Sequence, residues 1–379
     1  MAKIAIVGTG FVADYYVTTL ANHRELELVG VHDRDPERLK RFSGYHKLHA
    51  YQSLDACLAD RAVEIVVNLT NPESHYAVTC AALAAGKHVY CEKPLGMSAA
   101  EVADVGARAA AAGLHVFSAP ANALSDAQAL VARLLGEGRI GTPRLAYAEM
   151  EDGPVFRDNW RDWRSLSGTP WPGVHEFEIG CTLEHAGYAL SWLTSLFGPV
   201  ADIQAFSALT FPDKGPGTEG LKLGPDFSVG CLTFGSGVVA RVTCGLAAPR
   251  DRSLTLLGDE GMIVVRDLWD HRSPVHLARF GEKKAFAVRL AGWFERMAGR
   301  ALPFRLTAGR VVAYGRQGAA PVLPAYPSQI DFAGGIAAMA AAIAGGGNAA
   351  ASDRRALHLN EVALALSNGV GRYKPETTF

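Results

Sequence analysis

Short apolar runs alternate with amphipathic segments of helical length through the first 120 residues. The runs rich in β-branched residues predict strands and span residues 3–8, 26–33, 64–70, 87–93 and 114–120. Segments between several of them, such as 77–86 and 98–113, have the spacing of amphipathic helices. Strands that repeat with helical crossovers predict a parallel sheet with helices on both faces.

The pattern changes after about residue 122, where strand-like runs follow one another closely. A Gly-Ser-Gly turn at 235–237 joins the two central runs. These runs span residues 143–152, 201–209, 227–246, 253–267 and 273–280. We therefore expect two domains: a doubly wound parallel sheet in residues 1–121, and an α+β domain with a large, mostly antiparallel sheet in residues 122–379. The basic, aromatic segment 283–316 is interpreted as a solvated amphipathic surface, with a lid or a subunit contact as the alternative.

Residues 180–193 predict a helix with two unlike faces. One stripe is apolar and predicts a core contact; it comprises Leu183, Ala186, Gly187, Leu190 and Leu193. The opposite side carries Glu184, His185, Tyr188 and Trp192 in place of the Lys, Glu and Gln of a typical solvated face. This second face therefore has a function or a packing partner of its own.

Length and composition are those of an ordinary two-domain protein. The chain has 379 residues, a net charge of −1 and 49% apolar residues, which argues against a nucleic-acid or anionic-membrane partner. Its six cysteines show no CxxC spacing and indicate reduced core residues. The longest apolar segment, residues 333–347, is too short and glycine-rich to cross a bilayer, and the chain opens directly on a strand. We expect a cytoplasmic protein without a membrane partner.

The first strand runs directly into a glycine-rich turn, Gly8-Thr9-Gly10-Phe11-Val12-Ala13. Gly8 permits the tight turn, Gly10 lets the backbone approach a pyrophosphate, and the small Ala13 lets helix and strand pack closely. The backbone of Phe11 and Val12 then opens the helix whose N-terminus faces the phosphates. This strand–turn–helix context predicts a Rossmann domain that binds a nicotinamide dinucleotide.

Asp33 follows at the end of the second strand, where it would accept hydrogen bonds from the adenine ribose. This acid favours NAD. Arg34 and Arg38 lie close enough to hold a 2′-phosphate, so NADP remains an alternative.

Two further motifs stand at a specific spacing within residues 68–96: Thr-Asn-Pro-x-x-His, then Ala-Gly-Lys-His-Val-x-x-Glu-Lys-Pro. With them the chain resembles the Gfo/Idh/MocA family of NAD(P)-dependent oxidoreductases. The resemblance covers the whole first domain, and residues 352–369 resemble the closing helix of the family. It implies a homodimer or homotetramer formed through the second-domain sheet.

The resemblance also implies roles for individual residues. Glu92 would contact the nicotinamide ribose, and Lys93 would reach the substrate oxygen and assist its proton transfer. Thr70, Asn71 and His75 would line the cofactor path. Trp163 and Arg164 match the Trp-Arg pair that helps to close over the cofactor in many members.

The family's helix signature, Leu-x-Asp-x-Gly-x-His, is where this chain departs. Alignment on Leu183 and Gly187 places His185 at the Asp position and Ala189 at the His position, so the usual dyad is missing. Our hypothesis is that His185, oriented by a neighbouring carboxylate or hydroxyl, acts as the general acid/base beside the gap left by Ala189, while Lys93 polarises the substrate oxygen. Tyr188 and Glu184 are the other proton-handling candidates.

The acids and histidines at 175–185 match no standard metal-ligand spacing, so we expect no metal site. The leading function is NAD(P)-dependent hydride transfer to or from a secondary alcohol or ketone of a sugar, cyclitol or related polar metabolite. The alternative is a lyase or glycosidase that uses transient oxidation with no net redox change. A third alternative is a ligand sensor that has lost catalysis.

Overall fold

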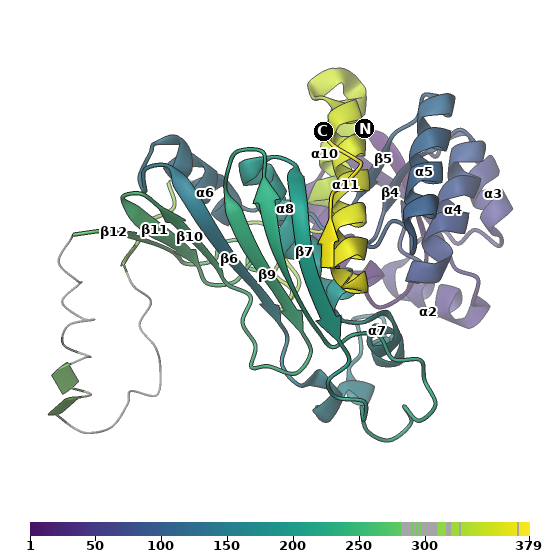
Figure 1. The fold of residues 1–379 in the computed structure, drawn as a ribbon. Coiled ribbons are helices and arrows are strands. Elements are labelled where there is room, and N and C mark those ends of the chain that lie inside the picture. Colours follow the sequence, from purple (N-terminus) through teal and green to yellow (C-terminus); the bar gives the residue numbers. More distant parts are fainter. Residues whose placement is uncertain are drawn as a thin grey trace.

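A parallel sheet of five strands forms the first half of the protein (Figure 1). Its strand order is β2-β1-β3-β4-β5, and every strand pair in it is parallel. The strands are β1 (Ala2–Val7), β2 (Leu26–His32), β3 (Ile65–Asn68), β4 (His88–Cys91) and β5 (Val116–Ser118). The computed structural model describes residues 1–281, 290, 293–294, 296–297, 309–315, 320–325, 327–369 and 371–379. The predicted amphipathic segment 283–316 therefore lies largely outside the described residues.

Three helices of this half, α2, α3 and α5, begin where a short polar side chain caps them. Asp35 accepts hydrogen bonds from the backbone N–H groups of Glu37 and Arg38, and Ser98 accepts one from Glu101. The helices are α1 (Ala13–Thr19), α2 (Pro36–His46), α3 (Leu54–Ala59), α4 (Pro72–Ala84) and α5 (Ala99–Ala112), and η1 (Leu20–Asn22) follows α1. The parallel, doubly wound sheet that the sequence predicts is confirmed.

A nine-stranded sheet forms most of the second half, in the order β13-β12-β11-β10-β6-β9-β8-β7-β14. Within it β6 and β9 pair in parallel, and the other described pairs are antiparallel. The strands are β6 (Pro143–Glu151), β7 (Val200–Ala208), β8 (Phe227–Phe234), β9 (Val239–Gly245), β10 (Leu254–Gly258), β11 (Gly261–Val265), β12 (Val275–Arg279), β13 (Arg310–Val311) and β14 (Gly371–Tyr373). The mostly antiparallel sheet is likewise confirmed.

Side chains alternate between the two faces of this large sheet. Ile203, Leu232 and Ala240 are fully buried on one face, whereas their neighbours Gln204, Cys231 and Arg241 are exposed on the other. Helix α8 (Cys181–Phe197) packs against the buried face, on β6, β8 and β9. Shorter elements complete this half: α6 (Asp126–Gly136), α7 (Gly173–Ile179), η2 (Asn122–Leu124), η3 (Val155–Arg157) and η4 (Trp160–Asp162).

The chain returns to the first half near its end. Helix α11 (Ala349–Asn368) contacts α5 and β5 on one side and α8 and β7 on the other, and it stands between the two sheets in Figure 1. The preceding α10 (Gly334–Ala341) contacts β4 and β5, and the π turn η5 (Ala342–Gly346) separates it from α11. In the described part of the chain no helix combines the length and hydropathy needed to cross a bilayer.

Candidate active site

The glycine turn after β1 leaves an open cradle at the N-terminus of α1. Gly8 has φ +98°, and a side-chain carbon there would lie 2.5 Å from the carbonyl carbon of Leu69. A carbon added at Gly10 meets nothing within 4 Å. Phe11 and Val12 are half-buried, and α1 begins at Ala13. The turn therefore has the free space and the backbone N–H groups that a dinucleotide pyrophosphate needs.

Asp33 is fixed at the edge of this cradle. Its Oδ2 accepts hydrogen bonds from the backbone N of Thr9 at 2.8 Å and from Thr9 Oγ1 at 2.9 Å. Arg38 approaches the same carboxylate at 3.5 Å through Nε, whereas Arg34 is exposed. The structure thus brings Asp33, Arg38 and the glycine turn together beside β2.

Glu92 and Lys93 follow β4, at the same edge of the sheet as the glycine turn. Tyr16 donates from its hydroxyl to Glu92 Oε1 at 2.7 Å, and the backbone N of Lys93 donates to Glu92 Oε2 at 3.0 Å. The Lys93–Pro94 peptide bond is cis. These contacts hold the Glu92 carboxylate in place and leave the Lys93 side chain to extend toward the second half of the molecule.

The residues after β3 shape the loops around this edge. His75 is 1% exposed, and its ring nitrogens face the backbone oxygens of Pro94 at 2.6 Å and Thr70 at 2.9 Å. The histidine therefore connects the two loops, and the expectation that its side chain lines the cofactor path stays a prediction. Asn71 instead reaches outward, to Glu73 at 2.7 Å and to His175 of α7 at 3.5 Å.

Lys93 pairs with a carboxylate from the second half of the molecule. Its partner is Glu184, in the first turn of α8, and the charges of both act on Glu176 of α7. The Lys93 and Glu184 side chains are 17% and 9% exposed. Burial opposes the charge on Lys93, but Glu184, Tyr188 and the other acids around it raise its pKa above the usual value. Lys93 therefore keeps its positive charge.

Glu176 is the second carboxylate at one ammonium. Burial first, and then the charge of Glu184, raise the pKa of Glu176 well above its usual value, although Lys93 opposes the shift. Two carboxylates beside a single cation favour retention of a proton between them.

Tyr188 lies one turn beyond Glu184 on α8. Its ring packs on Trp269, with the ring centroids 4.7 Å apart. Burial raises the pKa of Tyr188; Lys93 counteracts this, while Glu92 and Glu184 add to it. The neutral phenol thus sits among the same charged groups as Lys93, which fits a group that exchanges a proton with a substrate.

His185 turns toward a different partner. Its Nε2 lies 3.1 Å from Asp152 Oδ2, just after β6, and its buried Nδ1 has no hydrogen-bond partner among the residues that the structure describes. Burial works against ionisation of Asp152, but His185 and Arg252 hold its pKa below the usual value. Ala189 is fully buried in the core. On α8 it is Glu184 that pairs with Lys93, whereas His185 lies beside the carboxylate of Asp152.

The loop that contains Trp163 and Arg164 lies over the first half. Trp163 packs on Trp171 at 5.0 Å, whereas Arg164 is exposed and donates to the backbone oxygen of Trp163. Just beyond, Ser167 donates to Asp14 of α1 from its backbone N at 3.2 Å and its hydroxyl at 2.8 Å. This segment connects the two halves beside the glycine turn.

Three residues of this region were not predicted from the sequence: Asp152, Arg252 and Trp269. Arg252 is 1% exposed, pairs with Asp267 at 2.7 Å and lies 4.2 Å from the ring of Trp269. Trp269 in turn packs on Tyr188 and His185. The acidic run that ends β6 is a signal that could have found Asp152, because an Asp directly after a strand is a common site residue.

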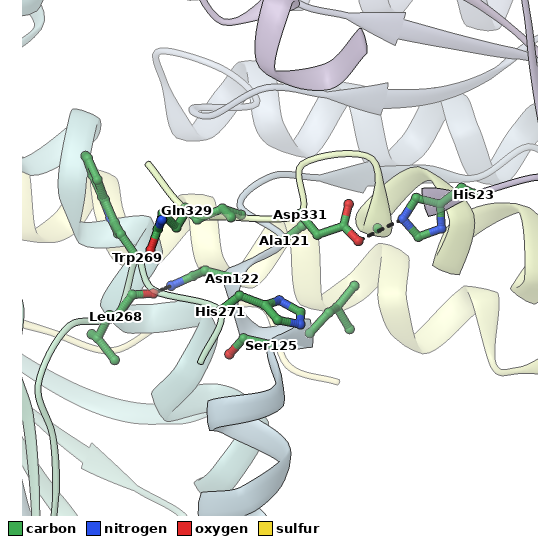
Figure 2. Close-up of a pocket in the computed structure, with 12 residues that line it drawn as sticks. His23, Ala121, Asn122, Ser125, Leu268, Trp269, His271, Gln329 and Asp331 are labelled. Atoms are coloured by element: carbon green, nitrogen blue, oxygen red, sulfur yellow. Dashed lines mark hydrogen bonds and ion pairs between the residues drawn. The ribbon is translucent and has the colours of Figure 1, made fainter. Parts of the chain in front are cut away.

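A separate cavity of about 160 Å³ opens at the junction of the two halves (Figure 2). His23, Asn122, His271 and Asp331 line it, and His23 contacts Asp331 at 3.0 Å. Trp269 is shared between this cavity and the cluster around Tyr188. The residues predicted for catalysis and cofactor binding do not line it. Among the residues that the structure describes, no group of three or more acids, histidines or cysteines is placed to hold a metal ion.

Comparison with known proteins gives matches along most of the chain. Residues 2–119 match the model of an oxidoreductase family with an NAD-binding Rossmann fold, and residues 129–264 match the Gfo/Idh/MocA C-terminal domain. A trans-1,2-dihydrobenzene-1,2-diol dehydrogenase from Mus musculus is 27% identical over 292 residues, covering 76% of this chain and 80% of that protein.

Solved structures share the fold at lower identity. A 3-ketoreductase from Actinomadura kijaniata, in complex with NADP and TDP-benzene, has a TM-score of 0.71 and 19% identity over 97% of both chains. An aldose–aldose oxidoreductase from Caulobacter crescentus, complexed with glycerol, has a TM-score of 0.69 and 18% identity over 99% of both chains.

Proposed function

The chain belongs to the Gfo/Idh/MocA family of oxidoreductases and is an NAD(P)-dependent enzyme acting on CH–OH groups, and from this we propose that its substrate is a secondary alcohol or ketone of a sugar, cyclitol or related polar metabolite. The observation that carries the proposal is the Lys93 ammonium, which pairs with Glu184 and lies among the same charged groups as Tyr188, at the sheet edge that carries the glycine turn. A cation and a phenol that influence each other electrostatically suit a substrate oxygen that gains or loses charge.

Each group has a part in this chemistry. The bound nicotinamide supplies or accepts the hydride. Gly8, Gly10 and the first turn of α1 would hold its pyrophosphate, and Glu92 its nicotinamide ribose. Lys93 polarises the substrate oxygen. Tyr188 exchanges the proton of that oxygen, because it lies among the same charged groups as Lys93, while His185 is engaged by Asp152.

We propose NAD as the preferred cofactor. Asp33 is held beside the glycine turn by two hydrogen bonds from Thr9, where its carboxylate suits ribose hydroxyls and repels a 2′-phosphate. Arg38 is already paired with Asp33 and Asp35 at 3.5 and 3.2 Å. These ion pairs leave less of its charge for a phosphate.

Support for a sugar-like substrate comes from the relatives and from the aromatic loop. The relatives include the aldose–aldose oxidoreductase and the 3-ketoreductase described above. Trp163 and Trp171 are only partly buried and pack on each other beside α7, where indole rings suit the apolar face of a sugar ring.

A panel of aldoses, cyclitols and dihydrodiols, assayed with NAD⁺ and NADP⁺ at 340 nm, tests the proposal. We expect net dinucleotide reduction by at least one polyol, with NAD⁺ preferred. Turnover of a glycoside with tightly retained NAD and no net absorbance change would instead establish the elimination alternative.

Variants separate the roles of the side chains. Lys93→Met and Tyr188→Phe should each lower kcat by about 10²–10⁴-fold, while His185→Ala keeps kcat within about tenfold of wild type. The exposed Lys40→Met serves as the control for loss of a lysine. An inactive His185→Ala beside a fully active Tyr188→Phe would restore His185 as the acid/base and refute the assignment to Tyr188.

A further inference from the structure

The loop that follows Lys93 lies between β4 and α5 and belongs to neither element. Its segment 94–97 is buried or partly buried, so the backbone N–H and C=O groups of this segment need partners inside the protein. Side chains from three helices supply them. His75 of α4 and Glu101 of α5 contact the two ends of the segment, and Asn360 of α11 binds its middle.

Asn360 binds a backbone donor and a backbone acceptor at the same time. Its Oδ1 accepts a hydrogen bond from the backbone N of Leu95 at 2.6 Å, and its Nδ2 donates to the oxygen of Gly96 at 3.1 Å. The side chain is 5% exposed. A carboxamide carries both an acceptor and a donor on one rigid group, so these two bonds fix the direction of the chain just beyond Lys93.

Helix α11 is itself tied to the second half of the molecule. It packs on α8, and Arg355 of α11 donates to the backbone oxygen of Ser191 in α8 at 2.5 Å. Figure 1 shows α11 between the two sheets. Helix α8 also carries Glu184, the partner of the Lys93 ammonium. The second half therefore holds this lysine at two points: α8 pairs with its ammonium, and α11 binds its loop through Asn360.

We propose that Asn360 is a positioning residue for Lys93, which fixes the lysine loop to the α8–α11 pair and so sets where the ammonium meets Glu184 and the substrate oxygen. The part that concerns the substrate rests on the proposed function. A lysine ammonium stands on a flexible stem, so its ion pair alone does not fix its approach to a third atom. A fixed backbone supplies that constraint, and a displacement of about 1 Å at a reacting centre costs about 10²-fold in rate.

Asn360→Leu keeps the approximate volume of the side chain and removes both hydrogen bonds. We expect kcat for the polyol substrate to fall by about 10²-fold. Dinucleotide affinity should stay within a few-fold of wild type, because the glycine turn and Asp33 are untouched. Glu361→Gln, at the next position of α11, changes a similarly buried side chain that binds the C-terminal segment, and this control should keep the wild-type kcat. A wild-type kcat in Asn360→Leu would overturn the proposal.

Asn360→Asp tests the two hydrogen bonds by pH, also if Asn360→Leu fails to fold. A protonated carboxyl has the same acceptor and donor as the amide, whereas the ionised form has no donor for Gly96. Burial raises the pKa of the new carboxyl above its ordinary value of about 4. The ratio of its kcat to that of wild type should therefore be highest near pH 5 and fall toward pH 9. His75 and Glu101, the titratable groups on the same loop, are present in both proteins and cancel in this ratio. A ratio that does not change with pH would refute the positioning role.

Acylation by acetic anhydride, followed at individual lysines by mass spectrometry, tests the position of Lys93 without any substrate. In the wild type this side chain is 17% exposed and paired with Glu184, which protects it. Asn360→Leu should speed acylation of Lys93 several-fold. Lys87, which donates to two backbone oxygens within the first half, is the internal control and should react at an unchanged rate. Unchanged acylation of Lys93 would refute the positioning role, whereas faster acylation without turnover of any polyol by the wild type would refute only the proposed substrate.

Discussion

Lys214 and Asp226 form a buried ion pair in the loop between β7 and β8. The ammonium lies 2.5 Å from Asp226 Oδ2, and both side chains are 1% exposed. Asp226 also accepts hydrogen bonds from the backbone N of Thr210 and Phe211 and from the Thr210 hydroxyl. The same loop binds the junction of α7 and α8, because Cys181 donates from its backbone N to the oxygen of Pro225 at 2.8 Å. The pair therefore supports the helix that carries Glu176.

Lys214→Met removes the cation and keeps most of the side-chain volume. Removing one partner of a buried ion pair costs about 3–5 kcal/mol. Since Asp226 retains three hydrogen-bond donors, we expect the lower end, about 3 kcal/mol. At about 2 °C per kcal/mol for a unit of about 250 residues, the Tm should fall by about 6 °C.

The effect should depend on pH in a defined direction. Burial opposes ionisation of Asp226, but Lys214 and the backbone donors hold its pKa below the usual value. A carboxylate with a lowered pKa stabilises the fold above its unfolded pKa of about 4 and loses that contribution as the pH falls through the folded pKa. The Tm difference between Lys214→Met and wild type should therefore be full at neutral pH and shrink in acid.

Differential scanning fluorimetry at neutral and acidic pH measures the loss of Tm in Lys214→Met and the change of that loss with pH. Lys222→Met, an exposed lysine of the same loop, controls for loss of charge and should leave the Tm unchanged. A neutral-pH Tm for Lys214→Met within about 1 °C of wild type would refute the reasoning.

Three further outcomes are expected. Gly8→Ala should weaken dinucleotide affinity about tenfold or more in a fluorescence titration, because its new carbon strikes Leu69 at a positive φ; unchanged affinity would contradict this. Burial raises the pKa of Glu151 to about 7, so the ionisation of Glu151 lowers the stability of the fold as the pH rises through that range. The Tm of Glu151→Gln should therefore rise relative to that of wild type between about pH 5 and about pH 8. A Tm difference that does not change with pH would show that Glu151 is not the group responsible. Leu145 and Val239 pair on the exposed face of the large sheet, where we propose that a homo-oligomer forms. Val239→Lys should lower the mass measured by light scattering. An unchanged mass would place the interface elsewhere.

The features that the sequence predicted are local ones. The glycine turn, Asp33 and the alternation of strands with helices are each encoded within a few residues, and a parallel sheet follows from the crossovers. Helix α8 was also predicted, with two faces of different character, and both are buried in the structure.

The side chain of α8 that meets Lys93 was not determined by the helix alone. Adjacent helical residues point about 100° apart, so an alignment displaced by one position exchanges Glu184 for His185. The direction is set by packing against residues distant in sequence, such as Lys93, 91 positions before Glu184. Asp152 and Trp269 likewise reach His185 and Tyr188 only through the order of strands in the large sheet.

The loop after Lys93 is held by Asn360 of α11, a residue that the ribosome adds long after the loop itself. Its side chain accepts a hydrogen bond from the backbone N of Leu95 at 2.6 Å and donates to the oxygen of Gly96 at 3.1 Å. The two partners lie 265 residues apart, which a ribosome takes about 13–50 s to translate. Throughout that interval the nascent first domain has its strands and glycine turn but no clamp on the loop that presents its lysine. A ribosome-bound chain that stops before residue 360 should accordingly have a folded first sheet while the loop after Lys93 lacks a fixed shape.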